Sequence, residues 1–433
     1  MKGLLDFQYN KLTSPIIKVI GVGGGGGNAV SHMYKQDIRN ISFAVCNTDS
    51  QALSSSPVPT KILIGKKGLG AGSKPNVAKQ AAEDSAETIK ELLSDGTEML
   101  FVTAGMGGGT GTGAAPVLAR ISREMGILTV GIITIPFLFE GERKISQALD
   151  GVDAMGKEVD ALLVINNERL REVYPDLNFL NAFAKADDTL TNAAKSIAEI
   201  ITETGYINRD FADVKTTLKD GGVAVISSGI GEGNERLDIA IKNALHSPLL
   251  NNNAVYDAQK ILIVLHFSEN AQIEMKEIKA MNDFINNFKT EVNVIWGAYF
   301  DNTLGNSVKV TILASGFGLN FDKLSGKRGS IGFSIGNTLN TPKNVDNSTQ
   351  KPNEKTRIEG YYGGGTFFKK TLSIVKLSLE DMDNDKLIEL LEQTPTYNRD
   401  PKLLQNSLKK NDSKGEGDGK DTNLKSKKTI HFD

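Results

Sequence analysis

The stretch GMGGGTGTG at residues 105–113 consists almost entirely of glycine and threonine. It lies between an apolar run, MLFVTA at 99–104, and a run with helical character, AAPVLARISREMG at 114–126. A loop with so little side chain can hold a ligand only through its backbone, and glycine lets the backbone approach a ligand closely. Because backbone N–H groups at the start of a helix attract anions, we expect this loop to bind phosphate.

A second glycine-rich loop, GVGGGGGNAV at 21–30, also follows an apolar run. From residue 16 to about 166, apolar runs typical of buried parallel strands alternate with helical patterns. The runs are 16–23, 43–47, 61–65, 99–104, 127–135 and 161–166. This alternation predicts a doubly wound parallel sheet, which binds ligands beyond the carboxyl ends of its strands. Both glycine loops should therefore face one crevice.

A long helix and a smaller α/β domain are predicted next. The helix has apolar residues spaced by three and four, as one buried face requires, and Gly205 should end it. These residues are Phe183, Ala186, Leu190, Ala193, Ile197 and Ile200. Four more strand-like runs follow at 222–229, 259–267, 292–300 and 308–317, with helical stretches near 234–246 and 273–288.

Composition restricts the class of protein. A length of 433 residues suggests two or three domains, and 39% hydrophobic with 24% charged residues is typical of a soluble globular protein. The net charge of -2 provides no general attraction to nucleic acid or to an anionic membrane. We expect no signal peptide, because the N-terminus MKGLLDFQYNKL lacks an apolar core. We also expect no membrane insertion, because the longest apolar run, 126–139, is too short to span a bilayer and contains Pro136.

Cysteine and histidine usage argues against a metal centre. Cys46 is the only cysteine, so an intrachain disulfide and a thiolate cluster are excluded, and a reducing cytoplasm is the simplest location. The four histidines, at 32, 246, 266 and 431, are scattered along the chain. We therefore expect no metal site built from protein ligands alone.

An NAD-dependent oxidoreductase of the Rossmann type is the main alternative. The first loop fits G-x-G-x-x-G at Gly21, Gly23 and Gly26, and Asp49 follows the second strand. An NAD site of this class needs only one glycine loop. A second, richer glycine loop is expected where a di- or triphosphate is held from two sides. Neither loop ends in GK[ST], so backbone amides and a bound cation would replace the usual P-loop lysine. A nucleotide-gated scaffold without hydrolysis is a third possibility.

Several motifs together resemble one family. GGGTGTG at 107–113 resembles the signature of the tubulin and FtsZ superfamily, over a match of about residues 15–318. The motifs that resemble successive FtsZ motifs in the right order are GVGGGGGNAVSHM (21–33), NTDSQAL (47–53), GLGAG (68–72), PFLFEG (136–141) and NRDFADV (208–214). The resemblance implies a GTPase that polymerises into the cytokinetic ring, in the cytoplasm at the midcell division site on the inner face of the membrane.

The resemblance also implies which residues hold GTP or GDP. Glu140 would contact the ribose, Phe183 would stack on the base, and Asn167 and Asp187 would contact the guanine. A carboxylate such as Asp187 suits guanine, whose N1–H and N2 amine are donors, and it repels adenine. The phosphate contacts would come from Gly24, Gly25, Gly26, Gly27, Asn28, Gly107, Gly108, Gly109, Thr110 and Gly111, with Gly70, Ala71 and Gly72 against the γ-phosphate.

Asn208, Asp210 and Asp213 match the catalytic positions of the family. Asp187 lies near the start of the long helix, so at about 1.5 Å per helical residue it should be roughly 30 Å from Asp210. One active site cannot contain both, so the acids must reach a nucleotide held by a neighbouring subunit. Such a head-to-tail contact does not close and generates filaments. We expect Mg²⁺ or a monovalent cation between the phosphates and the carboxylates.

Three departures from the family pattern stand out. Where E-G-x-x-R is common, Lys144 holds the arginine position and Arg143 comes one residue early, which leaves open which of them contacts the nucleotide. INNER at 165–169 stands where IPNDR is common, so Asn166 replaces a proline. EQTPTYNRD at 392–400 resembles the usual C-terminal peptide only loosely, and more residues follow it.

The chain after about residue 320 is rich in Asn, Lys, Ser, Thr, Pro and Gly, which bury too little apolar surface to fold alone. The resemblance implies that it tethers a peptide for membrane-anchoring and regulatory division proteins. The expected segments are an N-terminal extension (1–15), a GTP-binding domain (16–175), a central helix (176–204), a catalytic loop with the following segment (205–221), a C-terminal α/β domain (222–318), a flexible linker (319–378), an amphipathic segment with the partner-binding peptide (379–400) and a basic tail (401–433).

Overall fold

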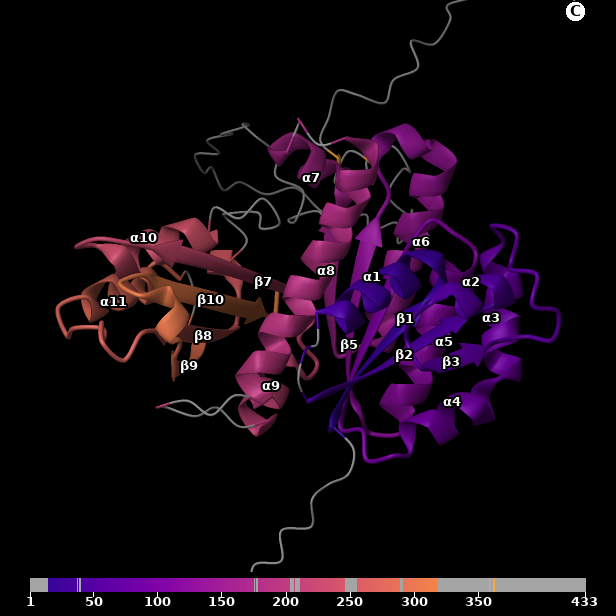
Figure 1. Cartoon of the computed structure of the whole chain (residues 1–433), viewed down its shortest axis with the longest axis horizontal. Coiled ribbons are helices and arrows are strands. Elements are labelled where there is room, and N and C mark those ends of the chain that lie inside the picture. Colours follow the sequence, from indigo (N-terminus) through magenta and orange to yellow (C-terminus); the bar gives the residue numbers. More distant parts are fainter. Residues whose placement is uncertain are drawn as a thin grey trace, which may run out of the picture. The chain divides into compact units, whose positions relative to one another are not determined.

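Six parallel strands form the part of the molecule that carries both glycine loops (Figure 1). They are β1 (Ile17–Val22), β2 (Ile41–Asn47), β3 (Thr60–Leu63), β4 (Met99–Gly105), β5 (Leu128–Ile135) and β6 (Ala161–Asn166), in the spatial order β3-β2-β1-β4-β5-β6. β1 pairs directly with β4, and Val22 lies opposite Ala104. The two glycine loops therefore leave neighbouring strand ends, and the predicted doubly wound sheet is confirmed.

The computed structural model describes residues 15–36, 38, 40–174, 176, 178–202, 206, 211–245, 255–288, 291–317, 358 and 361–362. All of these residues belong to one compact unit, Met1–Gly364. Gly205, Asn208 and Asp210 lie outside the described residues, as do the predicted peptide at 379–400 and the tail at 401–433.

Helices cover both faces of the parallel sheet. α1 and α8 pack on one face, while α5 and α6 pack on the other, with α3 and α4 against α5. The helices are α1 (Gly23–Lys35), α2 (Ser50–Ser55), α3 (Pro75–Asp84), α4 (Ala86–Leu93), α5 (Thr110–Glu124), the 3-10 turn η1 (Leu138–Glu140), α6 (Glu142–Glu158), α7 (Asn167–Val173) and α8 (Phe179–Thr202).

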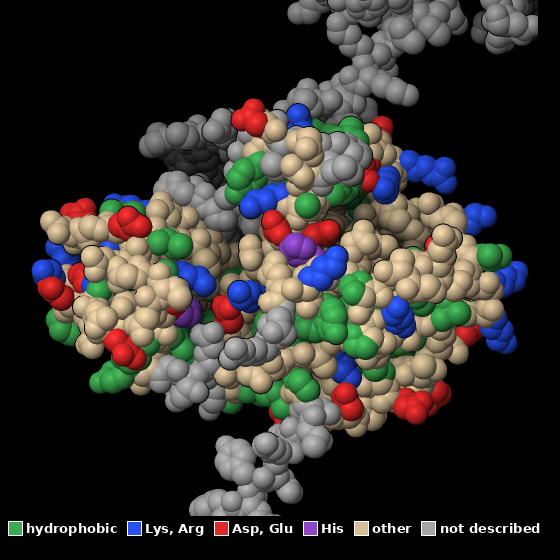
Figure 2. Space-filling model, viewed as in Figure 1, with side chains coloured by type: hydrophobic (Ala, Val, Ile, Leu, Met, Phe, Trp, Pro, Cys, Tyr) green, Lys and Arg blue, Asp and Glu red, His purple; other side chains and the backbone are tan. Residues whose placement is uncertain are grey.

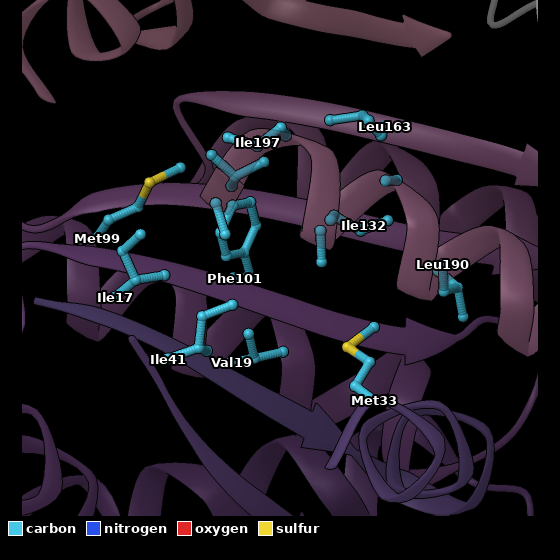
Figure 3. Close-up of a cluster of buried hydrophobic side chains, with 14 of the residues drawn as sticks. Ile17, Val19, Met33, Ile41, Met99, Phe101, Ile132, Leu163, Leu190 and Ile197 are labelled. Carbon is cyan, nitrogen blue, oxygen red and sulfur yellow. The ribbon is translucent and has the colours of Figure 1, made fainter. Parts of the chain in front are cut away.

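The core beneath α8 is built from alternate residues of the strands, because side chains two positions apart share a face (Figure 3). Phe101 and Ile132 of the sheet meet Ile197 of α8, and all three are fully buried. Burial of one such side chain stabilises the fold by about 1.5–3 kcal/mol. The predicted buried face of α8 is confirmed from Ala186 to Ile200, whereas Phe183 is half-buried.

A second group of strands continues the sheet as β7-β10-β8-β9. β10 is antiparallel to both of its neighbours, β8 and β9 are parallel, and β7 joins β6 through a short parallel pairing at Ala161 and Leu162. The elements are α9 (Phe211–Leu218), β7 (Gly222–Gly231), α10 (Arg236–Leu245), η2 (Val255–Asp257), β8 (Lys260–Phe267), α11 (Ile278–Asn286), β9 (Asn293–Phe300), η3 (Asn302–Leu304) and β10 (Val308–Ser315). All four strands predicted for the smaller domain are present.

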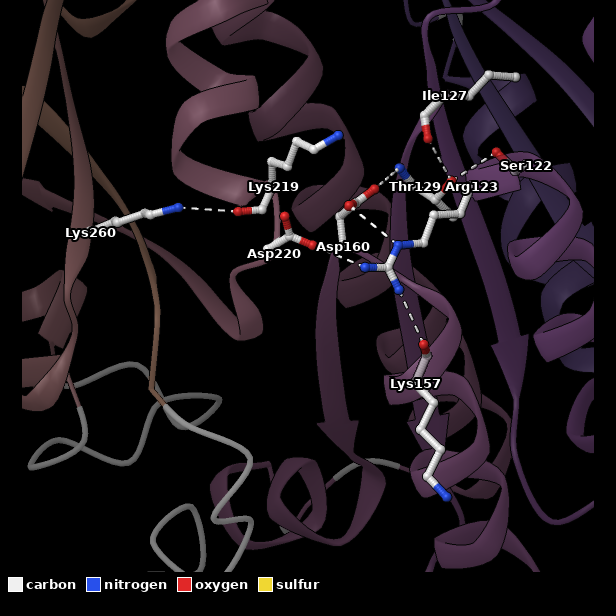
Figure 4. Close-up of polar contacts among 9 residues, drawn as sticks. All are labelled: Ser122, Arg123, Ile127, Thr129, Lys157, Asp160, Lys219, Asp220 and Lys260. Carbon is white, nitrogen blue, oxygen red and sulfur yellow. Dashed lines mark hydrogen bonds and ion pairs between the residues drawn. The ribbon is translucent and has the colours of Figure 1, made fainter. Parts of the chain in front are cut away.

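The carboxyl end of α9 is fixed to both groups of strands (Figure 4). Arg123, at the end of α5, forms an ion pair with Asp220 at 2.9 Å and lies 3.7 Å from the buried Asp160. From the other side, the Lys260 ammonium donates to the carbonyl oxygens of Thr216 at 2.9 Å and Lys219 at 3.1 Å. Because these carbonyls end the helix, the lysine charge also complements the helix dipole.

Charges of both signs are interspersed over the face of the molecule shown in Figure 2, with no continuous patch of one sign. This distribution agrees with the net charge of -2. Among the described residues, no helix is long and apolar enough to cross a membrane.

Three residues of the predicted linker belong to the described structure. Ile358 and Tyr362 are only 4% and 6% exposed, and Tyr361 lies beside them. The polar composition of residues 319–378 did not predict this packing, because a few buried side chains do not alter the average of so long a segment.

Candidate nucleotide site

The two glycine loops pack against each other through their backbones. Gly23 has a φ of +75°, and a Cβ added there would lie 2.8 Å from the backbone nitrogen of Gly111. A Cβ at Gly26 would lie 2.2 Å from the carbonyl oxygen of Thr103. Side chains are therefore excluded from the contact, which leaves α1 and α5 starting side by side with their first N–H groups at one edge of the sheet.

Thr48 connects these loops with the third glycine-rich loop, GLGAG at 68–72. Its hydroxyl lies 2.7 Å from the Thr110 hydroxyl, and its carbonyl oxygen accepts a hydrogen bond of 2.9 Å from the Gly70 N–H. Ala71 is close enough to Gly109 that a Cβ on that glycine would lie 2.9 Å from the alanine methyl. The structure thus brings the predicted phosphate-binding residues of all three loops together.

A pocket of about 360 Å³ adjoins the first loop. Gly24, Gly27 and Asn28 of α1 line it, and Asp187 of α8 contributes a carboxylate from across it. Burial raises the pKa of Asp187 to about 6; the charge of His32 lowers it and that of Asp188 raises it further. The carboxylate is therefore poorly solvated, and a ligand that donates hydrogen bonds would stabilise its charged form.

Two of the residues predicted to contact the nucleoside, Phe183 and Glu140, lie against Phe137, which follows β5 by two residues. The Phe137 ring packs edge-on against Phe183 with centroids 5.1 Å apart. Its N–H donates to the Glu140 carboxylate at 2.9 Å, which fixes that side chain. Asn167, the first residue of α7, is buried, and its Oδ1 is one of the buried side-chain atoms without a hydrogen-bond partner among the described residues. A buried acceptor of this kind calls for a donor from a ligand.

The structure separates Lys144 from Arg143. The aliphatic part of Lys144 lies against Gly107, where an added Cβ would be 3.0 Å from it, and the ammonium pairs with Glu140 at 2.5 Å. Arg143 instead lines a groove of about 1090 Å³ between α3, α5 and α6. The residues that line this groove include neither the first glycine loop nor Asp187.

Of the three predicted catalytic residues, the structure describes Asp213. It lies in the first turn of α9, beyond the far end of α8 from Asp187. The 15 residue steps from Asp187 to Thr202 alone span about 22 Å of helix. The structure does not bring Asp213 to the glycine loops of the same chain.

Two further residues support the loops without having been predicted. Thr48 bridges two of them, and Gln147 of α6 donates to the carbonyl oxygens of Gly107 at 2.9 Å and Gly108 at 3.0 Å. Thr48 belongs to the motif NTDSQAL, so the sequence indicated this segment but not the residue itself. Gln147 belongs to none of the motifs, so nothing in the sequence indicated its role. Asp49, the acid of the Rossmann alternative, caps α2 by accepting from Gln51 and Ala52.

No cluster of three potential metal-ligating side chains (His, Cys, Asp or Glu) occurs in the part of the chain that the structure describes.

Comparison with protein families identifies both domains. The model of the Tubulin/FtsZ family GTPase domain matches residues 16–175, and the model of the FtsZ family C-terminal domain matches 222–318. A third model, FtsZ C-terminal, matches residues 371–414. The cell division protein FtsZ of Porphyromonas gingivalis is 52% identical over 410 residues, which cover 93% of this chain and 89% of that protein. FtsZ of Aquifex aeolicus is 43% identical and covers 70% of this chain and 83% of its own length.

Solved structures agree with this assignment. An empty FtsZ dimer from M. jannaschii superposes with a TM-score of 0.64 at 38% identity, over 72% of this chain and 90% of that one. A GTPγS-bound protofilament of CetZ2 from Haloferax volcanii gives a TM-score of 0.59 over 69% of this chain and 92% of that one; at 22% identity, it shows the shared fold alone.

The positions of Lys144 and Arg143 predict different effects of two alanine substitutions. Lys144→Ala should weaken GTP binding about tenfold, because it removes the cation that pairs with Glu140, whereas Lys144→Arg should restore most of the affinity. Arg143→Ala should bind as the wild type does. Titration of a fluorescent GTP analogue measures all three, and a larger loss in Arg143→Ala than in Lys144→Ala would contradict the assignment.

Proposed function

Because this chain belongs to the FtsZ branch of the Tubulin/FtsZ family, we propose that it hydrolyses GTP as it assembles head-to-tail into filaments of the bacterial division ring. One observation carries the residue-level proposal. The glycine loops and Asp187 lie at one end of α8, while Asp213 lies beyond the other end. Nucleotide binding and hydrolysis then need different surfaces of the molecule.

GTP binds across the paired glycine loops. The N–H groups at the starts of α1 and α5 hold the phosphates, with the Thr110 hydroxyl beside them and the loop at 68–72 against the γ-phosphate. The base lies towards Asn28 and Asp187, whose carboxylate accepts from guanine N1–H and the N2 amine. The unpartnered Oδ1 of Asn167 supports a further contact with a guanine donor.

Hydrolysis uses Asn208, Asp210 and Asp213 of the next subunit. The carboxylates orient the attacking water against the γ-phosphate, and this geometry exists only after two subunits associate. Anchoring of the carboxyl end of α9 by Arg123 and Lys260 supports this role, because it holds the helix on which Asp213 lies. Loss of the γ-phosphate removes a ligand that both subunits contact, and the filament weakens.

A cation, Mg²⁺ or a monovalent ion, would supply neutralisation of the phosphate charge. Its oxygen ligands would be the phosphates of the nucleotide and the carboxylate of Asp213 from the next subunit. Lys144 adds a positive charge, which pairs with Glu140, on a side chain whose aliphatic part lies against Gly107. These groups compensate for the P-loop lysine that the sequence lacks.

We further propose that the filaments act in the cytoplasm at midcell and that the peptide at 379–400 binds membrane-anchoring and regulatory division proteins. The match of residues 371–414 to the FtsZ C-terminal model supports a conserved function of this segment. The oxidoreductase alternative has no support from the comparisons, and capping of α2 occupies the Asp49 carboxylate that it requires.

Sedimentation with GTP or GDP, with phosphate release followed in parallel, tests the proposed function. The wild-type chain should pellet with GTP and not with GDP, and phosphate release per subunit should rise cooperatively with protein concentration. Asp213→Ala should bind GTP normally and lose at least 90% of its turnover, roughly the tenfold or greater effect of removing a group that orients water. Wild-type turnover in this variant would refute the role of Asp213.

The raised pKa of Asp187 predicts the pH dependence of binding. Guanine requires the ionised carboxylate, so affinity should be constant above about pH 7 and fall as the pH drops through 6. At pH 5 the loss should be about tenfold, since one pH unit below the pKa leaves about a tenth of the group ionised. Asp187→Asn should bind more weakly at pH 7.5 but vary little between pH 5 and 7.5. Equal pH profiles in both proteins, measured by nucleotide titration, would contradict this assignment.

A further inference from the structure

The three described residues of the predicted linker are held on the GTPase domain by specific contacts. The Tyr362 hydroxyl donates to the carbonyl oxygen of Pro136 at 2.7 Å, and Asn166 Nδ2 donates to the carbonyl oxygen of Tyr361 at 2.8 Å. Ile358 is buried beside them. Burial, together with the charges of Glu140 and Glu168, raises the pKa of the Tyr362 phenol, so the hydroxyl keeps its proton and remains a donor.

Asn166 connects the docked residues with the start of α7. Its Oδ1 accepts from the Glu168 N–H in the first turn of that helix, and its Nδ2 donates to the carbonyl oxygen of Tyr361. One side chain therefore caps α7 and holds the docked residues.

The docking position adjoins the nucleoside side of the proposed site. Pro136 precedes Phe137, whose ring packs against Phe183, and Asn166 precedes Asn167. Pro136 and Asn166 follow or end the neighbouring strands β5 and β6, at the same edge of the sheet as the glycine loops. In the proposed filament this edge faces the Asp213 end of the next subunit.

We propose that Ile358, Tyr361 and Tyr362 form an intramolecular strap that occupies part of the assembly face and competes with the incoming subunit. This inference rests on the proposed head-to-tail assembly. The strap lowers the fraction of chains that are ready to associate, so it raises the protein concentration at which filaments form. Release of the strap accompanies subunit addition.

The chain can make this contact within one molecule. From Phe317 at the end of the C-terminal domain to Ile358 there are about 40 residues, which can extend over on the order of 130 Å. The contact includes two side-chain to backbone hydrogen bonds, and the side chains of Ile358 and Tyr362 are buried in it. A contact made by three residues is smaller than a stable subunit interface, which can therefore displace it.

Two substitutions release the strap by different routes. Asn166→Asp keeps the Oδ1 that caps α7 but removes the donor to Tyr361 and places a carboxylate opposite its carbonyl. Tyr362→Phe removes only the hydroxyl. Tyr299→Phe is the matched control, because its buried hydroxyl also donates to a backbone carbonyl, that of Ile200, far from the strap.

Chymotrypsin cleavage after Tyr361 and Tyr362, identified by mass spectrometry without nucleotide, reports docking directly. Cleavage should be slow in the wild type at every protein concentration, about fivefold faster in Tyr362→Phe and faster still in Asn166→Asp, as the loss of one or more hydrogen bonds requires. The Tyr299→Phe rate should match the wild type. Equal rates in all four proteins, or protection that grows with concentration, would overturn an intramolecular strap.

The critical concentration for pelleting with GTP reports the consequence. It should fall up to about fivefold in Tyr362→Phe and at least as far in Asn166→Asp, and remain unchanged in Tyr299→Phe. An unchanged or raised critical concentration in variants with faster cleavage would overturn the regulatory role. If the wild type itself did not pellet with GTP, the proposed function would fail, independently of the cleavage result.

Discussion

The close approach of two glycine loops at the ends of β1 and β4 is the constraint on which the rest of the site depends. At Gly23 and Gly26 the opposing backbone is so near that any side chain would collide with it. This contact brings the first turns of two helices to one point, where their free N–H groups add. In the proposed function, these groups hold phosphate without a P-loop lysine, and the catalytic side chains come from the next subunit.

The length of α8 has the complementary consequence. Its first half places Asp187 at the pocket, and its far end leads to α9 and Asp213. A rigid helix whose buried face packs on the sheet cannot bend to bring these groups together. In the proposed function, the chain therefore binds GTP at one end and contributes Asp213 to catalysis at the other, so that hydrolysis is coupled to assembly.

The local pattern of the sequence predicted most of the fold, because strand burial and the spacing from Ala186 to Ile200 depend on short-range periodicity. The family motifs likewise predicted which loops converge. The sequence could not distinguish the roles of Lys144 and Arg143. The two side chains leave α6 in different directions, so that Lys144 lies against Gly107 and Arg143 lines the neighbouring groove. Phe183 was expected in the core, but at the end of α8 it packs on Phe137 and stays half-buried. The contact between Tyr362 and Pro136 joins residues far apart in the chain, and no periodicity encodes it.

Mixing two variants tests the shared active site most directly. Asp187→Ala should fail to hold GTP, Asp213→Ala should hold it without hydrolysis, and each alone should release little phosphate. If the site is built from two subunits, the Asp213 end of an Asp187→Ala chain can act on GTP held by an Asp213→Ala chain. Phosphate release should then rise in the mixture well above the sum of the separate variants, with a maximum at intermediate ratios. Release that stays at the sum of the two at every ratio would contradict the account.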